Sequence, residues 1–128
     1  LKNEPLYPFG YGLSYTDFQI NNVRLKDNNL SKNDTLVVYY KITNTGLRDG
    51  SEVPQLYVEN DGIKKLKAFK RIFLDKGESL ETSFEISISA LESWDINKED
   101  YTVLAGHYNI HLGTSSQNIT FTAPFNVD

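Results

Sequence analysis

The two histidines, His107 and His111, are the first residues whose spacing could support chemistry, because they lie four positions apart. On a helix this spacing would place both imidazoles beside one metal ion. The surrounding pattern predicts a strand instead, on which the two side chains share a face but lie about 13 Å apart. We therefore expect two exposed strand residues and no metal site.

Carboxylates are the second candidate, since a facing pair can act as general acid and base. Asp49 and Glu52, which flank Gly50 in a predicted turn, are the closest such pair. Asp in a turn commonly caps the backbone, and a catalytic carboxyl group needs a recess that raises its pKa or excludes water. We expect no recess here and assign no catalytic residue.

A basic run occupies the middle of the chain: Lys64, Lys65, Lys67, Lys70, Arg71 and Lys76. Such a run could bind phosphate or nucleic acid. It is interleaved with apolar residues, however, and the formal net charge of the chain is −4, so nucleic acid is not expected as a partner. Lysines on an edge strand oppose edge-to-edge aggregation, and we favour that interpretation.

Trp94 is the single tryptophan, and its ring could stack on a sugar. With Leu91 three positions earlier, it could equally close one end of the fold, which is the interpretation that we favour. Asn-X-Ser/Thr glycosylation patterns begin at Asn29, Asn33 and Asn118, close to the number that chance allows in an Asn-rich chain.

Residues 1–15 form an aromatic segment rich in glycine and proline, with side chains suited to anchoring: Tyr7, Phe9, Tyr11, Leu13 and Tyr15. Pro and Gly at this density prevent regular structure, and exposed rings would form an interaction patch. We expect an extended arm that docks on a neighbouring domain of the same polypeptide. Carbohydrate is the alternative partner, with Tyr11 and Trp94 as stacking residues.

Beyond residue 15 the hydrophobic pattern has the period of two that is typical of strands. The expected strands are 18–25 with a bulge after Ile20, 36–42, 53–58 with Pro54 at an edge or bulge, 66–74, 80–88, 101–104, 108–112 and 119–125. Residues 90–95 are predicted as a short turn, and Tyr108, just after Gly106, fits a tyrosine corner. Seven or eight strands predict an all-β antiparallel sandwich of fibronectin type III or immunoglobulin type over residues 16–128.

Composition sets further bounds on this 128-residue chain, which fits one domain. It contains no cysteine, which excludes disulfides and thiolate metal sites, and no cofactor is expected. No apolar stretch is long enough to span a membrane. The absence of methionine indicates either an excised piece of a longer polypeptide, which we favour, or a processed polypeptide. We expect a soluble protein, with the periplasm or the extracellular space slightly favoured over the cytoplasm.

Several motifs together resemble the last domain of family 3 glycoside hydrolases, which include β-glucosidases and β-xylosidases. They are, in order, LYPFGYGLSYTDF at 6–18, NTGLRDGSEVPQLYV at 44–58, LKAFKR at 66–71, GES at 77–79, AGHY at 105–108 and GTSS at 113–116. The first is highly specific, and together they cover nearly the whole chain.

The resemblance implies a retaining parent enzyme whose nucleophilic Asp lies in a Ser-Asp-Trp context on a barrel, with a Glu acid/base on an α/β domain. Neither motif is present here, because Ser93-Trp94-Asp95 has another order. The one role that the resemblance implies for residues of this chain is that of the arm, whose side chains would anchor it to the α/β domain. It implies a non-catalytic C-terminal domain that stabilises the enzyme by docking and could shape the substrate entrance. The alternative is an independent carbohydrate-binding module.

Overall fold

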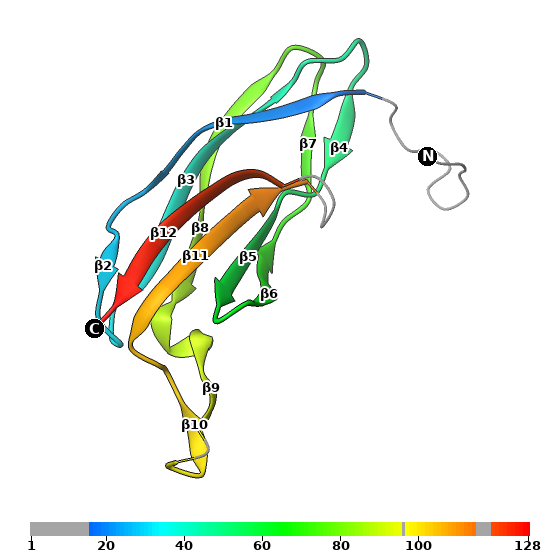
Figure 1. Ribbon diagram of the computed structural model, residues 1–128. Helices are drawn as coiled ribbons and strands as arrows, with labels where there is room; N and C mark the ends of the chain where they lie inside the picture. Colours follow the sequence, from blue (N-terminus) through cyan, green and yellow to red (C-terminus); the bar gives the residue numbers. More distant parts are fainter. Residues whose placement is uncertain (1–15, 96, 115–118) are drawn as a thin grey trace, which may run out of the picture.

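The computed structural model describes residues 16–95, 97–114 and 119–128, which form two facing layers of mainly antiparallel strands (Figure 1). One layer has the strand order β1-β3-β8, and the other has the order β2-β12-β11-β5-β6. The first comprises β1 (Phe18–Leu25), β3 (Thr35–Asn44) and β8 (Ser79–Ser87). The second comprises β2 (Asn29–Leu30), β12 (Ile119–Val127), β11 (Gly106–Gly113), β5 (Gln55–Asn60) and β6 (Ile63–Phe69). The predicted all-β sandwich is confirmed.

The core lies between the layers and follows the alternation of the strands. Along β3 every second residue is buried, and Leu36, Val38 and Ile42 have no exposed surface. They face Leu56, Ile110 and Leu112 of the other layer, which are equally buried. Because alternate side chains point to opposite faces, the other residues of each strand lie on the outside.

The bulge predicted in the first strand is present in β1. Its register against β3 shifts between Asn21 and Arg24, and Asn22 has a φ of 55°. This left-handed conformation is one that Asn adopts more readily than most residues. The shift allows Phe18 and Ile20 on one side of the bulge, and Val23 on the other, to pack against the same core.

The strand expected over 66–74 is wrong as a single element. The chain forms β6, is interrupted at Lys70, and continues as β7 (Ile72–Leu74), which pairs with β4 (Gly50–Glu52) instead of β5. Pro54 lies in the matching gap between β4 and β5, as its missing N–H requires. The two interruptions let the chain pass from one sheet pairing to another.

The segment after β8 also differs from the prediction. A 3₁₀ turn, η1 (Ile88–Leu91), follows Ser87, and a two-stranded ribbon of β9 (Ser93–Asp95) and β10 (Asp100–Thr102) comes next. Three of the residues predicted as turn therefore form a short strand. Leu91 is buried, as the closing role requires. The described part contains no helix long and apolar enough to cross a bilayer.

The two ends of the sandwich differ in what they carry. The described chain begins beside β4 and β7, at the upper right in Figure 1. The β9–β10 ribbon projects from the opposite end. The tyrosine corner is confirmed near that ribbon, where the Tyr108 hydroxyl donates to the Leu104 carbonyl over 2.6 Å.

Candidate functional site

Asn44, the last residue of β3, is a buried amide at the end of the sandwich that carries β4 and β7. Its Oδ1 accepts from the Thr16 hydroxyl at 2.8 Å and from the Gly46 N–H at 3.0 Å. Its Nδ2 donates to the carbonyls of Arg48 at 2.7 Å and Leu74 at 3.1 Å. With two acceptor and two donor bonds, the amide is fully satisfied. It joins the start of the described chain, the loop after β3, and β7.

Gly46 lies directly against the backbone at residues 16 and 17. A Cβ at position 46 would overlap the Thr16 hydroxyl and would lie 2.6 Å from the Asp17 nitrogen. Nearby, the Thr45 N–H donates to the Asp17 carbonyl over 2.8 Å. Only glycine permits this close approach, so the Asn-Thr-Gly motif fixes where residues 16 and 17 lie.

The carboxylates of Asp49 and Glu52 do different things. Asp49 Oδ1 accepts from the Lys76 N–H over 2.9 Å, which is the expected capping of a turn. Glu52 is partly buried, and its Oε2 accepts from the Val53 N–H over 3.0 Å. Burial raises the pKa of Glu52, and the Val53 bond opposes this weakly. The expectation that no carboxyl here has a raised pKa is thus wrong for Glu52.

The histidines lie on the outer face of the five-stranded sheet, as their strand position requires. His107 is exposed and bonds Asn126 over 3.0 Å. His111 is not a free surface residue, because its Nε2 lies 2.6 Å from Glu59 Oε1 and its Nδ1 lies 3.1 Å from the Thr122 hydroxyl. Three neighbouring strands are thereby cross-linked. Among the described residues, no cluster suited to a metal ion is present.

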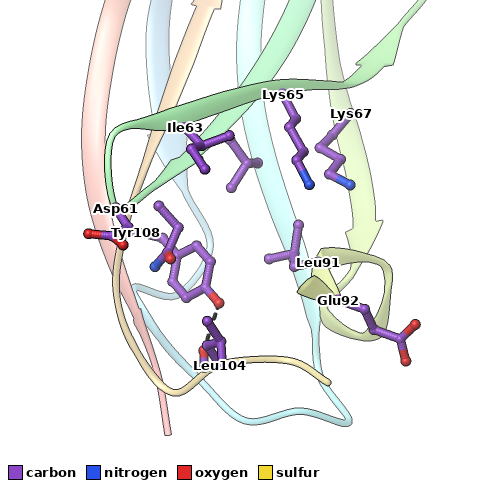
Figure 2. Close-up of a pocket in the computed structure, with 10 residues that line it drawn as sticks. Asp61, Ile63, Lys65, Lys67, Leu91, Glu92, Leu104 and Tyr108 are labelled. Carbon is purple, nitrogen blue, oxygen red and sulfur yellow. Dashed lines mark hydrogen bonds between the residues drawn. The ribbon is translucent and has the colours of Figure 1, made fainter. Parts of the chain in front are cut away.

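A hollow of about 210 Å³ lies under β6, next to η1 and the tyrosine corner (Figure 2). Its apolar lining includes Val58, Leu91, and the ring of Tyr108. Lys65 and Lys67 extend into it from β6, and Lys67 Nζ donates to the Ala90 carbonyl over 3.0 Å. The hollow combines an apolar floor with charged groups of both signs, since Asp61 and Glu92 also line it. Both carboxylates are exposed to solvent.

Two groups of predicted residues lie outside what the structure describes. The first is the docking arm, residues 1–15 with Tyr7, Phe9, Tyr11, Leu13 and Tyr15. The second is the side chain of Trp94, whose backbone pairs with Tyr101 in the β9–β10 ribbon. The roles assigned to these residues in docking and in sugar stacking therefore stay predictions.

Some functional features were not predicted from the sequence. The hydrogen bonds of Asn44 depend on four residues from three separate segments, and the link from Glu59 to His111 spans 52 positions. The family motif at residues 44–46 is the one signal that pointed to the first. Nothing local pointed to the second, because the register of β5 against β11 sets it.

These features define a β-sandwich of fibronectin or immunoglobulin type. Its buried Asn44 amide fixes the position of Thr16, where the described chain begins. A family model described as "Fibronectin type III-like domain" matches residues 52–116. The chain belongs to this family.

Curated relatives of the chain are glycoside hydrolases. "Periplasmic beta-glucosidase" of Salmonella typhimurium is 37% identical over 123 residues, which cover 91% of this chain and 16% of the relative. "Beta-xylosidase" of Formosa agariphila is 39% identical over 88% of this chain and 16% of its own length. The chain spans about a sixth of the curated relatives that it matches.

Solved structures agree. A "mutant (D270A) beta-glucosidase from Listeria innocua in complex with laminaribiose" superimposes with a TM-score of 0.81 at 30% identity, over all of this chain and 18% of that one. "Beta-glucosidase 3B from Thermotoga neapolitana in complex with alpha-D-glucose" gives 0.77 at 39% identity, over 96% of this chain and 17% of that one. The chain corresponds to an accessory domain of such hydrolases and not to a whole enzyme.

Proposed function

We propose that this chain is the non-catalytic C-terminal domain of a retaining, β-glucosidase-like family 3 glycoside hydrolase, and that it stabilises the catalytic domains by docking on them. The observation that carries the proposal is the contrast between the matched share of this chain and the matched share of its relatives. Between 88 and 98% of the chain matches, yet the match occupies only 15 to 19% of the eight curated relatives compared. The partners are therefore domains of the same polypeptide.

The geometry at residue 16 supports a role in attachment. Asn44 and Gly46 hold Thr16 and Asp17 through a buried amide and a close backbone approach. Because residues 16 and 17 are fixed on the sandwich, they would fix the orientation of the sandwich relative to the preceding domain. The arm residues Tyr7, Phe9, Tyr11, Leu13 and Tyr15 are the proposed anchors on the α/β domain. Shaping of the substrate entrance is a further part of the proposal.

The compartment is proposed from a relative. "Periplasmic beta-glucosidase" of Salmonella typhimurium is named for its location, and we propose the periplasm or the extracellular space for this protein. Signal-peptide processing of the full polypeptide, followed by fractionation of the cells, tests this directly.

The test of the main proposal compares the full polypeptide with a version that ends before Thr16. We expect the truncated enzyme to lose activity on an aryl β-glucoside much faster on heating, and the 128-residue chain alone to show no turnover. Equal thermal half-lives of the two enzymes would overturn the proposal. Retardation of the chain on a polysaccharide gel, lost on Trp94→Ala or Tyr11→Ala, would favour the carbohydrate-binding module instead.

A further inference from the structure

Exposed apolar side chains gather on one stretch, residues 63–73, which we call the β6–β7 edge. Within the described part of the chain, four of the seven large exposed apolar side chains belong to it. They are Ile63 at 61%, Leu66 at 44%, Phe69 at 64% and Phe73 at 64% exposure. A stretch of eleven residues is a small part of the chain, so these side chains are concentrated and not scattered.

The same stretch is strongly basic. It contains five of the 13 basic residues and no acidic residue, in a chain whose net charge is −4. Lys67 and Lys70 are held inward by carbonyls of Ala90 and Ser83. Lys64, Lys65 and Arg71 are exposed. The charge that the edge presents to the outside is therefore positive.

β6 is also a terminal strand, hydrogen-bonded to β5 and, within the described part of the chain, to no strand on its other side. The hollow under it opens between Lys65, Lys67 and Leu91 (Figure 2). Its lining carries two cations, Lys65 and Lys67, and two carboxylates, Asp61 and Glu92. The hollow itself is therefore of mixed charge, and the positive charge of the edge lies on its outside.

Protection against aggregation accounts for the lysines of an edge strand but not for its exposed rings. A strand that only avoids pairing has charges and few apolar residues. Phe69 and Phe73 work against that purpose, because large exposed apolar groups mark interaction surfaces. Cations and rings together fit a surface that is covered by a partner of complementary charge.

We propose that the β6–β7 edge is a second docking surface, separate from the arm, and that it contacts an acidic, partly apolar surface on another domain of the same polypeptide. This rests on the proposed function, which places the domain within a longer enzyme. The curated relatives compared leave more than four fifths of their length outside the match, so a large partner surface is available on the same chain. Opposite charge speeds docking and fixes its orientation.

Hydrogen exchange in the full polypeptide and in the 128-residue chain is the first test. We expect amides of residues 63–73 to exchange at least tenfold more slowly in the full polypeptide, because the partner covers the free edge of β6. Amides of β1, on the opposite edge of the other sheet, serve as the internal reference. Equal exchange of residues 63–73 in both proteins would overturn the inference.

Substitutions in the full polypeptide are the second test. Phe69→Ser with Phe73→Ser should shorten the half-life of activity at elevated temperature at least fivefold, while the melting temperature of the 128-residue chain moves by no more than about 3 °C, since both rings are exposed. Leu80→Ser, which removes an exposed apolar side chain from β8, is the matched control. An enzyme that responds no more to the first pair than to the control contradicts the inference.

Charge is tested by Lys64→Glu with Lys65→Glu, against Lys26→Glu with Lys32→Glu as the matched reversal elsewhere on the surface. The first pair should shorten the half-life at low salt, and added salt should narrow the difference from the unsubstituted enzyme. An unchanged half-life would contradict the proposal that the partner surface is acidic. If truncation before Thr16 destabilises the enzyme while every edge variant behaves as its control, the proposed function stands and this inference fails. If truncation has no effect, the proposed function itself fails.

Discussion

The hydroxyl of Thr16 donates a hydrogen bond to Asn44 Oδ1 over 2.8 Å, across 28 positions of sequence. Asn44 is the one buried polar residue of the described core. Its other three bonds go to backbone groups of Gly46, Arg48 and Leu74. A single amide thus fixes where the described chain enters the sandwich.

Asn44→Ala should destabilise the domain strongly. The substitution leaves buried backbone groups without partners, which costs about 2 to 4 kcal/mol in unfolding free energy. Urea denaturation followed by fluorescence measures this. Asn33→Ala, in an exposed turn, is the control and should change stability by less than about 0.5 kcal/mol. Equal effects of the two substitutions would mean that the amide contributes little to the fold.

Gly46→Ala should displace residues 16 and 17 from the sandwich. The new Cβ would overlap the Thr16 hydroxyl and approach the Asp17 nitrogen to 2.6 Å, and backbone cannot give way cheaply. We expect a loss of stability, together with faster hydrogen exchange of the Thr45 amide, whose acceptor is the Asp17 carbonyl. Thr16→Ala combined with Gly46→Ala should restore only part of the loss, because the Asp17 nitrogen remains. Full restoration would show that the hydroxyl alone makes the conflict.

Two buried tyrosines should respond to Phe substitution with opposite signs. Tyr108 donates to the Leu104 carbonyl over 2.6 Å, so Tyr108→Phe should cost about 1 kcal/mol. Tyr40 stacks on Phe84, and its buried hydroxyl has no hydrogen-bond partner among the described residues. Tyr40→Phe removes that unsatisfied group and should leave stability unchanged or raise it by up to about 1 kcal/mol. The melting temperatures of both variants test these two expectations. A lower melting temperature of Tyr40→Phe would show that the Tyr40 hydroxyl has a hydrogen-bond partner.

Glu52→Gln should stabilise the domain at neutral pH. Burial raises the pKa of Glu52 above its ordinary value near 4.5, so the folded state binds a proton more tightly than the unfolded state. The favourable contribution of Glu52 is therefore complete below about pH 4.5 and is lost as pH rises through the folded pKa. Gln keeps the acceptor for Val53 and does not ionise.

The melting temperatures of the Glu52→Gln variant and the unsubstituted chain should accordingly converge near pH 4 and separate by pH 7, with the variant higher. Exposed Glu81→Gln is the control for the loss of one negative charge. A variant that melts lower at pH 7 would show that the Glu52 carboxylate is needed in its ionised form.

Much of the fold could be predicted because local pattern and tertiary environment agree. The alternation of β3 matches its burial, and that of β8 does so from Phe84 onward, whereas Leu80 is exposed. The slip after Ile20 appears as the bulge between Asn21 and Arg24. The prediction of one strand over 66–74 was wrong because the apolar pattern continues through Lys70, whereas the hydrogen-bonded partner changes there from β5 to β4. Period-two pattern reports which face is buried and carries no information about which strand lies alongside.

The sequence by itself determined the class of fold, the tyrosine corner and the family, since these depend on local periodicity, turn residues and short motifs. The tertiary structure alone decided that Asn44 binds Thr16, that His111 contacts Glu59, and that β6 is a terminal strand of its sheet carrying Phe69 and two exposed cations, Lys64 and Lys65. Each of these depends on strand register and sheet order. They are set by the packing of the whole core, so residues far apart in the chain become neighbours that no local pattern specifies.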